Sequence, residues 1–117
     1  MTSDVLVIGN SDQNHVVHAT ELASAGYAVN EAHSIKEARV MLKAGIVPRS
    51  VVIDMADNTD MTALANFMEF LENRALSDIP VIIISTSHDG NGVHAVLPHP
   101  VHPPHLVDHV RDALMLQ

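Results

Sequence analysis

Four histidines are clustered near the end of the chain, in the stretch LPHPVHPPHLVDH over residues 97–109. His105 and His109 are four residues apart, so on a helix their rings would share one face and could bind one zinc or nickel ion. His99 or His102 could supply a third ligand. The alternative is that these side chains are exposed and bind nothing, because nine histidines among 117 residues readily produce such a pair by chance.

Short apolar runs indicate the strands that would position such residues. Runs of this kind, bounded by turn residues, are typical of strands buried on both faces of a parallel sheet. The expected strands cover residues 4–8, 27–32, 50–54, 80–85 and 94–97. The segment 80–85, PVIIIS, is the most apolar of them and rich in β-branched residues, so we expect it to be the central strand.

Helical periodicity fills the intervals between these strands. Ser11 or Asp12 can cap a first helix that ends at Gly26. Ser34 with Glu37 forms a capping box at the start of a second helix, which Gly45 and Pro48 end. Pro103 and Pro104 begin the last helix. Apolar positions recur at helical spacing in each interval: Val16, Val17, Ala19, Leu22 and Ala23; Ile35, Ala38, Met41 and Leu42; Met61, Leu64, Phe67, Met68 and Leu71; Leu106, Val110 and Leu114.

The alternation of strands and helices predicts the α/β class, with a doubly wound five-stranded parallel sheet in a single domain over residues 1–117. In such sheets, ligands bind beyond the carboxyl ends of the strands, where the winding changes direction. The residues expected at those ends are Gly9, Asn10, Asp54, Ser85, Thr86 and His99. The topology alone therefore selects them as candidate site residues.

Composition and charge exclude several classes of function. Six basic residues against fourteen acidic residues give a formal charge of −8, which disfavours direct binding to nucleic acid or to anionic lipid. No apolar run approaches the roughly 18 residues of a membrane span, and the start MTSDVLVIGNSD lacks the basic region of a signal peptide. We therefore expect a cytoplasmic protein. The absence of cysteine excludes disulfides and thiolate chemistry.

Four motifs occur in order along the expected strands: VLVIGNSD at the first, VVIDM at the third, IPVIIISTS at the fourth and LPHPV at the fifth. With this spacing, the chain resembles the CheY-like receiver domains of two-component response regulators over nearly all of its 117 residues. The resemblance implies a flavodoxin-like fold. It also implies that Asp54 is equivalent to the aspartate that accepts a phosphoryl group from a histidine kinase.

The positions that handle charge in working receivers carry other residues here. The resemblance implies two acidic residues that help to hold Mg²⁺ at the end of the first strand, where this sequence has Gly9 and Asn10. It implies a lysine at the end of the fifth strand, where this sequence has His99. Because Mg²⁺ usually relies on one or two carboxylates, we expect it to bind weakly or not at all, and we expect no resident cofactor. A neutral imidazole is not the electrostatic equivalent of an ammonium group.

The switch positions are altered in part. By the resemblance, Ser85 matches the hydroxyl residue that contacts the phosphoryl group, whereas Val96 stands where the family carries an aromatic residue. The segment between Ser85 and His99 is shorter than in the family by about two helical turns. We therefore expect the fourth helix to be short or missing. The resemblance implies that this helix belongs to the usual output surface, together with the fifth strand and fifth helix.

These departures predict an atypical receiver, or pseudo-receiver. We expect it to be no enzyme and to act as a phosphorylation-independent protein-interaction module in phosphorelay signal transduction. The expected partner is a histidine kinase or a signalling effector, with a homodimer as one form of assembly. The alternative is a working receiver phosphorylated on Asp54 with unusual Mg²⁺ coordination, in which Asp12, Asp57 or Asp60 replaces the missing acids. A third hypothesis is a metal-responsive sensor that uses the C-terminal histidines.

Overall fold

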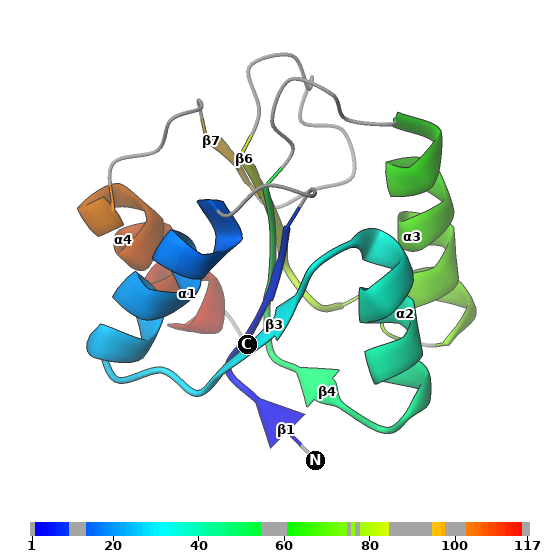
Figure 1. Ribbon diagram of the computed structural model, residues 1–117, viewed down its shortest axis with the longest axis horizontal. Helices are drawn as coiled ribbons and strands as arrows, with labels where there is room; N and C mark the ends of the chain where they lie inside the picture. Colours follow the sequence, from blue (N-terminus) through cyan, green and yellow to red (C-terminus); the bar gives the residue numbers. More distant parts are fainter. Residues whose placement is uncertain are drawn as a thin grey trace.

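Five parallel strands form the centre of the structure, a computed structural model that describes residues 2–9, 14–54, 61–74, 76, 78–84, 95–97 and 103–115. The strands are β2 (Val5–Ile8), β3 (Val29–Ala32), β5 (Val51–Asp54), β6 (Val81–Ile84) and β7 (Ala95–Leu97). Their order is β3-β2-β5-β6-β7, and each neighbouring pair is parallel (Figure 1). The predicted five-stranded parallel sheet is confirmed.

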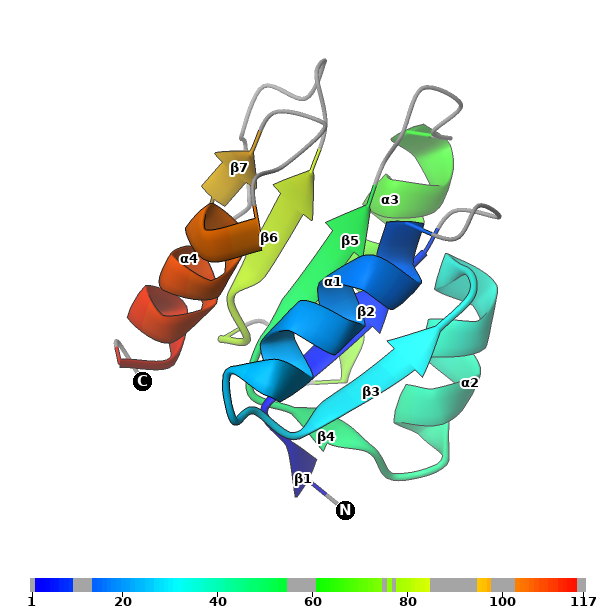
Figure 2. The same cartoon turned by 60° about the vertical axis from the view of Figure 1, so that its left-hand side comes forward.

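Helices cover both faces of this sheet, as Figures 1 and 2 show. In the described ranges, α1 (Asn14–Ser24) and α4 (Pro103–Met115) lie on one face, and α2 (Ile35–Lys43) and α3 (Met61–Asn73) lie on the other. The doubly wound architecture is therefore confirmed. Residues 85–94, in which we expect a short or missing helix, lie outside the described residues. No helix in the described part of the chain has the length and apolar character to cross a membrane.

Alternate residues of each strand enter two separate cores, because successive strand side chains point to opposite faces. Leu6, Ile8, Val51, Ile53, Val81 and Ile83 pack towards α2 and α3, and Val5, Val7, Val52, Ile82, Ile84 and Leu97 pack towards α1 and α4. Every residue of β2, β5 and β6 is buried. Burial on both faces explains why β2 and β6 are apolar throughout and why β5 is apolar up to Asp54.

The prediction that residues 80–85 form the central strand is wrong. The middle strand of the five is β5, and β6 is the fourth. The reason is that apolar content reports burial on both faces, which β2, β5 and β6 share. It separates these interior strands from the edge strands β3 and β7, but it does not rank them among themselves.

The predicted boundaries of the second helix are confirmed at both ends. Ser34 is the N-cap of α2, and its hydroxyl oxygen accepts a hydrogen bond of 3.1 Å from the backbone N–H of Glu37. After the helix, Gly45 has a φ of 105°, a left-handed conformation that glycine adopts without the steric cost of a Cβ atom. The capping box and the glycine therefore set the length of this helix.

The side chains of α1 are arranged differently from the apolar positions noted in its sequence. Val17 is 53% exposed and Ala23 is exposed, whereas His18 is buried beside Ala19 and Leu22. His18 and Leu22 are four residues apart, so both lie on the stripe that faces the sheet. Ser11 and Asp12, the expected caps of this helix, lie outside the described residues.

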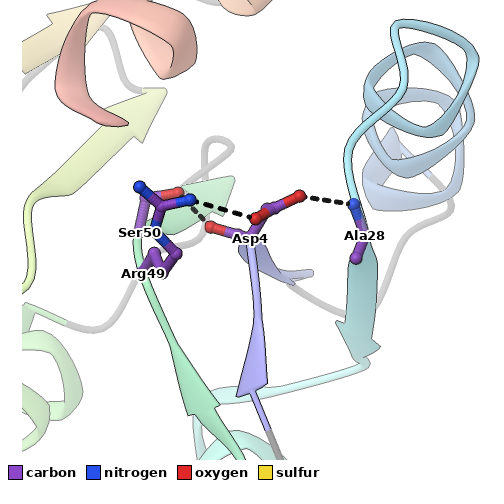
Figure 3. Close-up of polar contacts among 4 residues, drawn as sticks. All are labelled: Asp4, Ala28, Arg49 and Ser50. Carbon is purple, nitrogen blue, oxygen red and sulfur yellow. Dashed lines mark hydrogen bonds and ion pairs between the residues drawn. The ribbon is translucent and has the colours of Figure 1, made fainter. Parts of the chain in front are cut away.

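Two further strands were not predicted. β1 (Thr2–Ser3) and β4 (Val47–Pro48) form a separate parallel two-stranded sheet, too short to leave a periodic signal. Between β1 and β2, Asp4 joins three segments (Figure 3). Its Oδ2 accepts a hydrogen bond from the Ala28 N–H at 2.9 Å, its Oδ1 lies 3.5 Å from Arg49 Nη1, and its carbonyl accepts a bond from the Ser50 hydroxyl at 2.8 Å.

We expect Asp4→Ala to lower the free energy of unfolding by about 1–2 kcal/mol, because the Ala28 N–H loses a charged acceptor. Asp4→Asn should cost less, because its amide oxygen can still accept that bond. The ion pair itself should contribute under about 1 kcal/mol, because Arg49 is 52% exposed. Urea unfolding followed by circular dichroism measures the difference, and equal losses in the two variants would contradict this assignment.

Candidate functional site

Asp54 lies at the carboxyl end of the middle strand, where the winding of the sheet changes direction. It is the last residue of β5, between β2 and β6, and its side chain is 0% exposed. Because Val52 packs towards α1 and α4, the alternation along the strand directs Asp54 to the same face. The carboxylate therefore points towards the N-terminal half of α1.

His18 of α1 meets this carboxylate. Its Nε2 lies 2.9 Å from Asp54 Oδ2, and only 7% of His18 is exposed. An ionised carboxylate has no proton to donate, so the imidazole N–H donates the hydrogen bond. The pair connects residues 36 positions apart in the sequence and ties α1 to the middle strand.

Burial makes this hydrogen bond important for stability. A carboxylate removed from water loses its hydration and must recover that free energy from donors in the protein. Hydrogen bonds that involve a charged group contribute about 1.5–3 kcal/mol, and a buried group deprived of its partner is more costly still. The His18 hydrogen bond therefore offsets part of the cost of burying this side chain.

The other predicted site residues are described only in part. Gly9 is buried directly after β2, where its N–H donates a 2.8 Å hydrogen bond to the Ala32 carbonyl. It lies near Asp54 in the sheet, because its neighbour Ile8 pairs with Ile53. Val96 is half-buried in β7 and pairs with Ile83 of β6. Asn10, Ser85 and His99 lie outside the described residues, as do Thr86, Asp12, Asp57 and Asp60.

The described residues fit Mg²⁺ poorly. By the resemblance to receiver domains, a magnesium site would need anionic oxygens beside Asp54. Gly9 has no side chain that could supply one. One oxygen of Asp54 already accepts the His18 N–H. No group of three or more histidine, cysteine or acidic side chains within the described ranges is arranged to hold a metal ion.

The structure describes two of the four C-terminal histidines. His105 is exposed and His109 half-buried, four residues apart on α4 as predicted. His99 and His102, the residues expected to complete the set of ligands, lie outside the described residues. The metal-sensor hypothesis thus stays a prediction.

Sequence reasoning missed His18, the residue that makes the closest described contact with Asp54. A signal was present, because His18 lies four residues before the buried Leu22 on a helix that follows the first strand. A polar side chain on an apolar stripe implies a buried partner. The sequence alone did not identify that partner, because the two residues are brought together only by the packing of α1 on β5.

Comparison with known proteins identifies the fold. No family model and no curated protein sequence matches the chain. Among solved structures, it is similar to a CheY-like response regulator receiver domain protein from Methanospirillum hungatei JF-1, with a TM-score of 0.78, 15% identity and coverage of 97% of this chain and 94% of that one. The receiver domain of NtrX from Brucella abortus gives a TM-score of 0.76 at 20% identity, with coverage of 97% and 100%.

The receiver domain of the hybrid histidine kinase CckA is also similar, with a TM-score of 0.70, 26% identity and coverage of 95% and 98%. Against the longer NtrX chain crystallised with ADP, this chain covers 27% of the length. The protein therefore has the CheY-like, flavodoxin-like fold of receiver domains. Asp54 occupies the strand end at which the resemblance places the phosphoacceptor.

A double-mutant cycle tests the buried pair. We expect His18→Leu and Asp54→Leu each to lower the free energy of unfolding by about 1–3 kcal/mol, because each removes this hydrogen bond from the buried polar group that remains. The double variant should lose clearly less than the sum of the two, with a coupling of about 1 kcal/mol or more. Additive losses in urea unfolding would show that the two side chains do not interact.

Proposed function

We propose that this chain is a receiver domain of a two-component signalling system that acts as a phosphorylation-independent protein-interaction module. The hydrogen bond between His18 and Asp54 is the observation that supports this proposal most strongly. It engages the carboxylate that would have to act as the nucleophile in phosphoryl transfer. The fold shared with solved receiver domains supports the wider assignment.

The state of the carboxylate argues against attack on a phosphodonor. To react, an oxygen of Asp54 must approach the phosphorus atom in line with the leaving group. The side chain is 0% exposed, and its Oδ2 accepts a hydrogen bond from the His18 N–H. Phosphorylation would require this bond to open and the buried site to admit a highly charged donor.

The surroundings supply little of the charge stabilisation that phosphoryl transfer needs. Enzymes and receivers that transfer this group depend mainly on positioning and on cations that neutralise the developing charge. Gly9 contributes no carboxylate for a metal ion, and both lysines of the chain, Lys36 and Lys43, belong to α2 on the opposite face of the sheet from His18. We propose accordingly that Mg²⁺ binds weakly or not at all and that the protein is no enzyme.

The proposed partners are proteins of a signalling pathway. The similar structures include receiver domains of a hybrid histidine kinase and of a response regulator, which makes a histidine kinase or a signalling effector the expected partner. The charge of −8 supports a protein partner over nucleic acid or an anionic membrane. We also propose a cytoplasmic location, because no apolar run of the sequence approaches the length of a membrane span. A second copy of the chain is an alternative partner.

The alternative function is a phosphoaccepting receiver with unusual Mg²⁺ coordination. The position of Asp54 at the carboxyl end of β5 favours it, because this is the strand end at which ligands bind in such sheets. In that case the His18 side chain would have to leave the carboxylate when phosphate or metal arrives. The two functions make opposite predictions for one experiment.

We expect the protein to remain unmodified when it is incubated with Mg²⁺ and a small phosphodonor such as acetyl phosphate, because the Asp54 carboxylate is sequestered. Intact mass spectrometry at neutral pH gives the readout, with a working receiver treated in parallel as the positive control. Stoichiometric phosphorylation that disappears in Asp54→Asn would overturn the proposal and establish the alternative.

The sensor hypothesis has its own test. Calorimetry with Zn²⁺ should show no micromolar binding if the C-terminal histidines are ordinary surface residues. Micromolar binding that is lost in His105→Ala would instead support a metal-responsive function.

A further inference from the structure

The basic residues of this acidic protein are concentrated on one face, formed by α2 and the end of α3. Four of the six lysines and arginines lie there, namely Lys36, Arg39 and Lys43 on α2 and Arg74 directly after α3. The same two helices carry three acidic residues, Glu37, Glu69 and Glu72, and the rest of the chain carries two basic residues against eleven acidic ones. We call these four residues, with Val40 and Phe70, the basic patch.

Phe70 organises three of these cations. Arg39 Cζ lies 5.2 Å from the centroid of its ring, Arg74 Cζ 5.4 Å and Lys43 Nζ 5.9 Å. Each contact of this kind contributes about 0.5–1 kcal/mol at an exposed site. The three positive charges thus share one aromatic ring, although they repel each other.

The ring is a rigid support for them. Phe70 is half-buried and stacks on Phe67, with ring centroids 6.4 Å apart and an interplanar angle of 20°. Phe67 is completely buried in the core between the sheet and the helices α2 and α3. Side chains held against such a support lose less conformational entropy when they bind a ligand, which favours a preformed site.

No acidic side chain neutralises the patch within the described part of the chain. The ion pairs there involve His18, Arg49 and Arg111, and none involves a residue of the patch. Glu37 of α2 and Glu69 and Glu72 of α3 form none of these ion pairs. Helical geometry places Glu69 about 100° from Phe70 around α3 and Glu72 nearly opposite it. The positive charge is therefore available to a partner.

The outer face of α2 adds an apolar contact. At 100° per residue, Lys36, Arg39, Val40 and Lys43 all lie within one sector of about 100°. Val40 is 61% exposed between Lys36 and Lys43. An exposed valine at the edge of a cationic sector, flanked along the helix by two lysines, suits a ligand that has both negative charge and an apolar side chain.

We propose that the basic patch is a docking surface for an acidic segment of a partner protein, whose carboxylates pair with Arg39, Lys43 and Arg74 while an apolar side chain covers Val40. Arginine forks bind carboxylates in a bidentate manner, which gives geometric specificity. A protein segment is favoured over nucleic acid because the charge of −8 repels a polyanion that extends beyond the patch. The surface would be the partner-binding part of the function proposed above.

The probe is a fluorescein-labelled synthetic peptide of glutamates interrupted by a single leucine, titrated with the intact protein and followed by fluorescence anisotropy. We expect saturable binding that weakens with salt, and no binding of the same peptide with glutamine in place of glutamate. The double variant Arg39→Gln/Arg74→Gln should weaken binding about tenfold or more, because it removes two charged hydrogen-bond donors.

The matched control is Arg49→Gln/Arg111→Gln, which has the same composition and the same net charge but leaves the patch intact. It should bind the peptide like the wild type, and circular dichroism should show that both double variants are folded. Absence of saturable binding, equal weakening in both variants, or tighter binding of single-stranded DNA than of the peptide would overturn the proposal. A dimer seen by light scattering and dispersed only by Arg39→Gln/Arg74→Gln would assign the patch to a second copy instead.

This experiment does not involve Asp54, so its outcome is independent of the phosphorylation test. Failure here would remove the docking surface and leave the state of Asp54 unchanged. Phosphorylation of Asp54 would overturn the proposed function and leave the docking surface in place.

Discussion

A buried carboxylate needs a hydrogen-bond donor, and in this protein His18 supplies one to Asp54. The bond joins the first helix to the middle strand at the point where the sheet changes its winding. It stabilises the fold and occupies the reactive group with the same contact. We propose that this one contact both stabilises the site and keeps Asp54 from accepting a phosphoryl group, which is the basis of the proposed interaction function.

Much of the fold could be predicted because it depends on local patterns. β2, β5 and β6 are continuous apolar runs, and the Ser34–Glu37 capping box with Gly45 set the ends of α2. The order of strands within the sheet was less accessible. Both β5 and β6 are buried on both faces, and the middle strand β5 is the less apolar of the two because it ends in Asp54, so the central strand was assigned wrongly. The short pair β1 and β4 was missed because two residues carry no period.

The candidate site was predicted in position but not in detail. Asp54 was identified from its place at a strand end and from the family resemblance, whereas its contact with His18 depends on packing across 36 residues and could not be seen. The grouping of Arg39, Lys43 and Arg74 around Phe70 is also a tertiary effect, because α2 and α3 must pack side by side to create it. In both cases, long-range packing gave ordinary residues a specific role.

The state of the His18 imidazole in solution shows whether the Asp54 carboxylate is sequestered. Nitrogen-15 NMR of the ring can be followed while the protein is titrated with Mg²⁺ and beryllofluoride, which mimics the phosphoryl group on a carboxylate. If Asp54 is sequestered, the hydrogen bond between His18 Nε2 and Asp54 should persist unchanged throughout the titration. A saturable change of the His18 resonances, with loss of that hydrogen bond, would show that Asp54 is free to react and would contradict this sequestration.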